Sequence, residues 1–280
     1  MTQINTAGNQ EQAAASVNLD INAVSQRLIE TKGLFYRYPR RGVVLDQVDF
    51  TLYPKERIAL TGANGAGKTT FLHLLVGLKK AKGGEIIAFG QSRIAEKEFV
   101  EVRAKAGFLF QDPDDQLFCP TVLEDVAFGP LNLGKSRDEA LTIARNTLAC
   151  LGMSGFEESI THQLSGGEKR MITLACVLAM EPEVLLLDEP TNALDKTARQ
   201  RLIDTLKSLP QAMIIISHDH DFLAQLATRT LVLNEGKLLD GAKALDEVKE
   251  LNEDKAVNTV SDSAEAQSDR QSQVKEDAEA

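Results

Sequence analysis

One short stretch of the chain has the composition of a phosphate-binding loop. Residues 62–69 read Gly-Ala-Asn-Gly-Ala-Gly-Lys-Thr, which fits the pattern G-x-x-x-x-G-K-[ST]. Its glycines allow a tight turn with backbone N–H groups aimed at phosphate oxygens, and the helix that follows adds its positive dipole end. We expect Lys68 to reach the β- and γ-phosphates and the Thr69 hydroxyl to bind Mg²⁺. The expected nucleotide contacts here are Gly62, Ala63, Asn64, Gly65, Ala66, Gly67, Lys68, Thr69 and Thr70.

A pair of carboxylates follows an apolar run 120 residues after Lys68. The run is Val-Leu-Leu-Leu at 184–187, and Asp188 and Glu189 come next. A buried strand that ends in an aspartate holds Mg²⁺ in P-loop enzymes, so Asp188 is the candidate metal ligand. Glu189 would then lie beside the γ-phosphate, where it could orient or deprotonate the attacking water. An Asp-Glu pair alone usually marks a solvated strand end, but its distance from the P-loop favours the catalytic interpretation.

The elements around these residues predict an α/β fold. Apolar, β-rich runs lie at 57–62, 106–111, 183–190 and 212–219, and helical patterns lie at 68–78, 168–180 and 196–209. Strands that alternate with helices predict a mainly parallel sheet with helices on both faces. The segment 34–53 instead has the pattern of an antiparallel hairpin, and the mostly helical stretch 121–163 predicts an inserted helical subdomain.

Composition indicates one globular unit with polar ends. The chain is 43% hydrophobic and 26% charged, and it contains no run of about eighteen apolar residues that could span a bilayer. Its first residues show no secretory signal, so we expect a cytosolic protein. We expect a mobile arm at 1–27, one ordered domain at 28–250 and a disordered acidic tail at 251–280. The net charge of −10 argues against a nucleic-acid-binding face.

A third loop resembles the signature of a known family. Leu-Ser-Gly-Gly-Glu at 164–168 is similar to the L-S-G-G-Q loop of the nucleotide-binding domains of ABC transporters. Alone, Ser-Gly-Gly is equally well an ordinary helix-capping turn; beside the two motifs above, it indicates this family. The resemblance implies an ABC-type ATPase with ATP and Mg²⁺ as its ligands. It also implies a dimer, most simply a homodimer, in which the loop of one protomer closes on the ATP of the other. The residues that the loop contributes are Ser165, Gly166, Gly167 and Glu168.

Other family motifs occur in the same order. Gln111 resembles the Q-loop glutamine, which senses Mg²⁺ and links to the membrane partner, and Asp195 resembles the D-loop aspartate. His218 resembles the switch histidine at the γ-phosphate, where it could stabilise charge rather than act as a base. Tyr38 is the expected aromatic that stacks on adenine; Tyr36, two residues away on the same side of a strand, is the alternative.

Two further stretches narrow the resemblance. Residues 111–118, QDPDDQLF, and 124–134, EDVAFGPLNLG, resemble the ATPase subunits of energy-coupling-factor transporters, which import vitamins and cobalt or nickel ions. The second stretch looks most like the cobalt/nickel subunit. The resemblance implies a peripheral protein on the cytoplasmic face of the cell membrane. An integral-membrane scaffold would dock near the helical subdomain, about 112–165, and a substrate-binding membrane component would complete the importer.

Alternatives from other classes fit less well. The same engine could serve a vitamin importer, for example of biotin, or another ABC transporter. Ribosome-associated ABC ATPases usually carry two domains, whereas this chain has one P-loop. DNA-repair members insert long coiled coils between the P-loop and the Asp-Glu pair, but here only 120 residues separate Lys68 from Asp188. A P-loop kinase would lack the Ser-Gly-Gly signature. A non-hydrolysing subunit is disfavoured by Glu189 and His218, and no nucleic-acid partner is expected.

Overall fold

The computed structural model describes residues 27–241. Three predicted segments lie outside this range: the N-terminal arm except for Arg27, the last residues of the domain (242–250), and the acidic tail (251–280). Within it, no helix combines the length and the apolar character needed to cross a bilayer.

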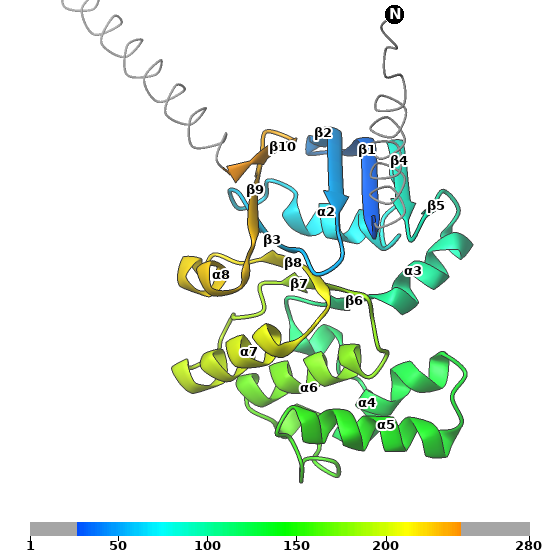
Figure 1. Cartoon of the computed structure of the whole chain (residues 1–280), viewed down its shortest axis with the longest axis vertical. Coiled ribbons are helices and arrows are strands. Elements are labelled where there is room, and N and C mark those ends of the chain that lie inside the picture. The colour runs from blue at the N-terminus through cyan, green and yellow to red at the C-terminus, as the bar shows by residue number, and fades with distance from the viewer. Residues whose placement is uncertain (1–26, 242–280) are drawn as a thin grey trace, which may run out of the picture. The chain divides into compact units, whose positions relative to one another are not determined.

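The larger of two sheets has six strands in the order β10-β9-β3-β8-β7-β6 (Figure 1). All pairings from β9 through β3, β8 and β7 to β6 are parallel, which confirms the predicted parallel core. Because parallel strands end at the same edge, the segments after β3, β8, β7 and β6 meet there. The strands are β3 (Arg57–Thr61), β6 (Ala106–Leu109), β7 (Val184–Asp188), β8 (Ala212–Ile216), β9 (Arg229–Asn234) and β10 (Lys237–Asp240).

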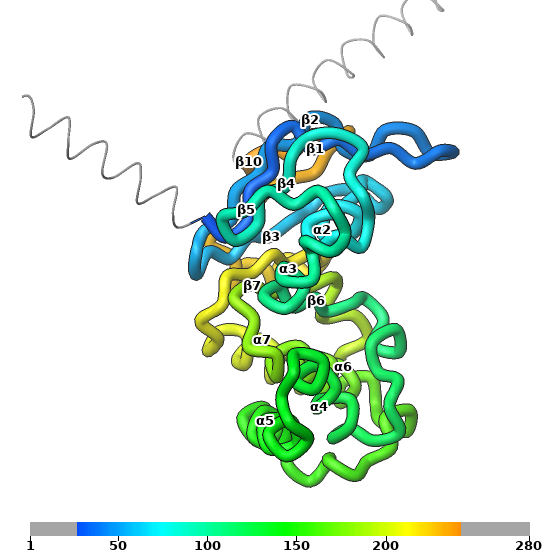
Figure 2. The backbone as a smooth tube through the Cα atoms, turned by 90° about the vertical axis from the view of Figure 1, so that its right-hand side faces the viewer, coloured from blue at the N-terminus to red at the C-terminus, as the bar shows by residue number. Residues whose placement is uncertain are grey.

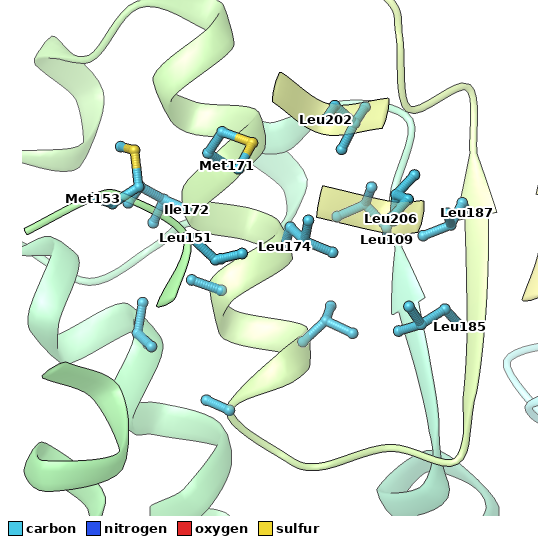
Figure 3. Packing of buried hydrophobic residues seen from close by; sticks show 14 of the residues in the cluster. Leu109, Leu151, Met153, Met171, Ile172, Leu174, Leu185, Leu187, Leu202 and Leu206 are labelled. Carbon is cyan, nitrogen blue, oxygen red and sulfur yellow. The ribbon is translucent and has the colours of Figure 1, made fainter. Parts of the chain in front are cut away.

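The central strands of this sheet are buried on both faces. Along β7, Leu185 and Leu187 pack with α6 and α7 on one face (Figure 3), whereas Val184 and Leu186 join the core on the other face. Side chains alternate along a strand, so one apolar run supplies two core layers. The sheet is thereby fixed between its helices, and the loops at its edge start from rigid positions.

The second sheet is antiparallel, in the order β2-β1-β4-β5. Strands β1 (Ile29–Tyr38) and β2 (Gly42–Leu52) form the predicted hairpin, in which Tyr38 pairs with Gly42. The remaining strands are β4 (Gly83–Ala88) and β5 (Gln91–Ser92). Apolar residues of this sheet pack on the parallel sheet through α2 (Lys68–Leu75). Helix α3 (Phe99–Lys105) leads into β6.

The helical insertion lies at the opposite end of the described body from β1 and β2 (Figure 2). It is built from α4 (Val122–Asn132) and α5 (Arg137–Cys150), which pack on α6 (Gly166–Leu178). Each of these helices begins with a capping box, in which a Ser or Thr side chain and a Glu three residues later bond to each other's backbone N–H. Helices α7 (Lys196–Ser208) and α8 (His220–Leu226) follow.

The predicted helix boundaries differ from those of the structure by up to three residues. The helix predicted at 68–78 ends at Leu75, because Gly77 adopts φ of 71° and its missing Cβ would lie 2.3 Å from the Phe99 ring. The helix predicted at 168–180 begins two residues earlier, at Gly166, because Ser165 caps it.

Candidate functional site

The segments that leave the sheet edge surround a cavity of about 380 Å³. The P-loop follows β3, Gln111 follows β6, Asp188 ends β7, and His218 follows β8. The predicted site residues that line the cavity are Tyr38, Asn64, Gly65, Gly67, Lys68, Thr69, Thr70, Gln111, Asp188, Glu189 and His218. Strand order therefore gathers residues from segments far apart in the sequence around one cavity.

The P-loop depends on glycine at two close contacts. Gly62 has φ of 135°, and a Cβ there would lie 2.3 Å from the carbonyl oxygen of Leu233. Gly67 has φ of 112°, and its Cβ would lie 2.4 Å from Val44 Cγ1. Gly67 also precedes α2, whose first turn has neither a side-chain cap nor an acidic residue. Its N–H groups are therefore free of a capping side chain, as an anion-binding helix terminus requires.

Lys68 places a buried cation in the loop. Its Nζ donates hydrogen bonds to the carbonyl oxygens of Gly62, at 2.7 Å, and Ala63, at 3.1 Å. Burial lowers the pKa of Lys68, and the nearby Glu189 and Asp188 act in the opposite direction. An anion in the cavity would add a favourable charge partner for this ammonium group.

Thr69 and Asp188 form a pair suited to magnesium. The Thr69 hydroxyl hydrogen-bonds to the Asp188 carboxylate, which is 2% exposed. Burial raises the pKa of Asp188. The described residues hold no cluster of three or more His, Cys, Asp or Glu side chains at metal-binding spacing. This donor set fits Mg²⁺, which commonly takes one or two carboxylates and completes its shell with phosphates and water.

Glu189 and His218 lie together at the edge of β7 and β8. Parallel pairing sets Asp188 opposite Ile216, so the residues that follow leave the sheet side by side. His218 Nε2 lies 3.3 Å from Glu189 Oε1, and the His218 backbone N–H donates to Glu189 Oε2 at 3.3 Å. Glu189 has φ of 47°, a left-handed conformation that costs energy in a non-glycine residue. Burial raises the pKa of Glu189, and His218 opposes this shift.

The structure distinguishes the two candidate aromatic residues. Tyr38 lines the cavity and its hydroxyl lies 3.0 Å from Thr70 Oγ1. Tyr36 contacts Tyr38 edge to face at 5.0 Å between ring centroids, but it packs against the core and does not line the cavity. The side chain at the cavity is therefore Tyr38.

Sequence reasoning missed Arg41, which also lines the cavity. It lies in the turn between β1 and β2, and its Nη2 would be 3.3 Å from a Cβ at Gly65. The guanidinium group thus lies against the P-loop, where it could bind phosphate oxygens. A basic residue in a turn three residues after Tyr38 was the available signal.

Ser165, the rest of the signature loop and Asp195 do not line this cavity, whereas Asn192, three residues before Asp195, does. Ser165 Oγ donates to Glu168 Oε2 at 2.7 Å, and the Ser165 backbone N–H donates to the same oxygen at 2.8 Å. Asp195 caps α7 by accepting a bond from the Ala198 N–H at 2.7 Å. Ser165 and Asp195 are exposed, so both loops are open to contact from outside the chain.

Arg170, a second residue missed from the sequence, joins the signature helix α6 to the Q-loop. It is 1% exposed and donates to the carbonyl oxygens of Phe110, at 2.7 Å, and Gln111, at 2.6 Å. The neighbouring Lys169 forms an ion pair with Asp114 at 2.6 Å. The start of α6 and the segment after β6 are therefore joined by two adjacent side chains.

Comparisons with known proteins agree with this arrangement. The ABC transporter family model matches residues 45–192. A putative ABC transporter ATP-binding protein of Brucella suis biovar 1 (strain 1330) is 56% identical over 70% of this chain and 82% of its own length. The energy-coupling factor transporter ATP-binding protein EcfA of Methanocaldococcus jannaschii is 43% identical over 76% of this chain and 77% of its own.

Solved structures share the fold. CbiO1 of Clostridium perfringens, described as part of the ABC transporter complex CbiONQ, has a TM-score of 0.69 at 31% identity and covers 81% of this chain and 93% of its own. A dimeric ATP-binding cassette in a post-hydrolysis state with ADP and Pi has a TM-score of 0.68 at 25% identity, covering 75% and 96%. With its P-loop, carboxylate-ended strand and parallel core, the chain belongs to the ABC transporter family and is an ATPase of that family.

Proposed function

We propose that this chain energises an energy-coupling-factor importer whose cargo is cobalt or nickel ions. Residues 28–250 form its ATPase domain, which works as a homodimer on the cytoplasmic face of the cell membrane. The observation that carries the proposal is the cavity that unites Lys68, the Thr69–Asp188 pair and the Glu189–His218 pair. The EcfA relatives and the CbiO1 structure support the transporter type, and the resemblance of residues 124–134 to the cobalt/nickel subunit supports the metal cargo.

The residues of the cavity divide the work of ATP hydrolysis. Lys68 and the P-loop N–H groups hold the phosphates, and Tyr38 stacks on the adenine. Thr69 and Asp188 hold Mg²⁺, with Gln111 at the cavity wall as a further contact. When bound, this ion neutralises charge that develops on the phosphoryl oxygens.

Glu189 acts on the attacking water. Its raised pKa, caused by burial, makes the carboxylate a better proton acceptor than an exposed glutamate. His218 Nε2 lies 3.3 Å from Glu189 Oε1, and the imidazole stabilises the charge on the γ-phosphoryl group. Oriented this way, water attacks the γ-phosphate as the β–γ bridging bond breaks, yielding ADP and phosphate.

The dimer follows from where the signature residues lie. Ser165 and Gly166 are exposed and lie outside the cavity of their own chain. A second protomer would present its ATP to them, with Asp195 at the same interface. The dimeric cassette of the same fold, which holds ADP and Pi, supports this assembly.

This chain has an apolar surface on which the membrane scaffold could dock. An apolar groove of about 220 Å³ lies between α4, α6 and β6. Its rim carries the rings of Phe118 and Phe128, which are 64% and 43% exposed and lie 4.8 Å apart. In its wall, Asp125 is buried and its Oδ2 lacks a hydrogen-bond partner. We assign this groove to a short helix of the integral-membrane scaffold that brings a donor to Asp125. The neighbouring Gln111, in the loop after β6, would relay its docking to the ATP cavity.

The test is a pull-down of the tagged protein from detergent-solubilised membranes, with mass spectrometry of partners and elemental analysis of bound metal. Phe128→Asp should lose the scaffold and keep basal ATPase activity. The matched control is Ile94→Asp, at an apolar residue that is 75% exposed and outside the groove, and it should keep the partner.

Each partner recovered has a distinct meaning. A metal-binding integral protein beside the scaffold supports cobalt or nickel import. A vitamin-binding partner keeps the engine and overturns the cargo. Ribosomes or DNA in place of membrane proteins would overturn the transporter assignment and leave the ATPase.

A further inference from the structure

An ion pair ties helix α7 to the residue that follows His218. Arg199 Nε lies 2.5 Å from Asp219 Oδ2, and Nη2 lies 2.8 Å from Oδ1. This two-point contact fixes the direction of both side chains as well as their separation. Because Asp219 directly follows His218 in the chain, the pair controls the backbone next to the imidazole.

Each partner of the pair is itself fixed. Asp219 Oδ1 also accepts the Phe222 N–H at 2.9 Å and so caps α8. Arg199 lies in the first turn of α7, and its backbone N–H donates to the carbonyl oxygen of Asp195 at 2.9 Å. A chain of hydrogen bonds thus connects Asp195, through the start of α7, to Asp219 beside His218.

A second contact holds the residue before His218. Ser217 is 3% exposed, and its Oγ lies 3.3 Å from Thr191 Oγ1. The same oxygen accepts the Asp219 N–H at 3.1 Å. Thr191 follows Glu189 by two residues, so the residue before His218 is tied to the segment that joins β7 to α7, and the residue after it is tied to α7 itself.

The His218 side chain depends on this support. It is 57% exposed, so packing restrains it little, and its place beside Glu189 is set mainly by its backbone. We propose that Arg199 is a positioning residue for ATP hydrolysis, which acts through Asp219 to hold His218 against Glu189. This proposal rests on the assignment of Glu189 and His218 as the hydrolytic pair.

The helix α7 offers a matched control. Lys207 Nζ donates to Gln225 Oε1 at 3.1 Å, so it also joins α7 to α8, but eight residues along the helix from Arg199. Arg199→Ala should lower kcat for phosphate release by about tenfold or more, since misplacement by about 1 Å can cost about 10²-fold. ATP affinity and the melting temperature should change little. Lys207→Ala should leave both kcat and ATP affinity unchanged.

Two conservative variants separate positioning from folding. Arg199→Lys keeps the charge and loses the two-point geometry, so it should recover only part of kcat. Asp219→Asn keeps the cap of α8, because Asn is as good an N-cap as Asp, and should lower kcat as Arg199→Ala does. A loss of kcat that follows the melting temperature across these variants would overturn the proposal.

The deciding measurement is a double-mutant cycle with single-turnover phosphate release. If Arg199 acts through His218, Arg199→Ala should cause no further loss in a His218→Ala background. An equal further loss would overturn the proposal and leave the hydrolytic pair intact. Normal hydrolysis by His218→Ala itself would overturn the hydrolytic assignment and this proposal together.

Discussion

The buried guanidinium of Arg170 donates to the carbonyl oxygen of Gln111 at 2.6 Å. Arg170 is in the second turn of helix α6, and Gln111 is the second residue of the loop after β6. A second bond reaches the carbonyl of Phe110 at 2.7 Å. The helix that follows Ser165 and the loop that contains Gln111 are therefore bonded to each other. A displacement of helix α6 should therefore displace the loop that contains Gln111, and the reverse.

Arg170→Met should lower the free energy of unfolding by about 2 kcal/mol, because two carbonyl groups lose bonds from a charged donor. The adjacent Lys169→Met removes the ion pair with Asp114, whose carboxylate is 67% exposed. Exposed pairs contribute less than about 1 kcal/mol, so this control should be much milder. Urea titration of both variants measures the difference; equal destabilisation would contradict the structural role of Arg170.

Glu189→Gln should stop hydrolysis while ATP still binds. Glutamine keeps the shape of the side chain but cannot accept a proton from water, and loss of a general base costs about 10²–10⁴-fold in rate. The ATP-bound dimer should then accumulate, visible by size-exclusion chromatography with MgATP. Normal phosphate release by this variant would remove Glu189 from the mechanism.

The same substitution should stabilise the nucleotide-free protein. Burial raises the pKa of Glu189, so the folded state binds a proton more readily than the unfolded chain. This carboxylate therefore lowers stability as pH rises from its unfolded to its folded pKa, and the loss persists above both. At neutral pH, Glu189→Gln should raise the melting temperature by about 2 °C. The gain should vanish at a pH below both pKa values. A gain that is the same at every pH would contradict the burial argument.

The predicted residues that line the cavity could be found from the sequence because their chemistry fixes residue type and spacing. Lys68, Asp188 and His218 each follow an apolar strand, and parallel pairing brings the ends of such strands together. The parallel core and the hairpin at 34–53 were predictable for a similar reason: each has its own hydrophobic period.

Contacts between distant side chains were not predictable. Arg170 and Gln111 are 59 residues apart, and nothing in the local pattern of either indicates the other. The Ser165–Glu168 bond shows the opposite difficulty. From the sequence, Ser-Gly-Gly is either a helix-capping turn or a signature loop. The structure shows that Ser165 and Glu168 do cap α6. One local motif can serve both purposes, so its role as a partner-binding loop stays a prediction.

Tyr38→Ala should weaken ATP binding by about tenfold, since stacking of a base on an aromatic side chain contributes about 1–3 kcal/mol. Tyr38→Phe keeps the ring and removes the hydroxyl that lies 3.0 Å from Thr70 Oγ1. It should therefore bind ATP normally and lose about 1 kcal/mol of stability.

Tyr36→Ala is the matched control because Tyr36 lies on the same strand but does not line the cavity. Titration with a fluorescent ATP analogue measures all three variants. Weaker binding by Tyr36→Ala than by Tyr38→Ala would reassign the stacking residue to Tyr36, and weak binding by Tyr38→Phe would show that the hydroxyl matters more than the ring.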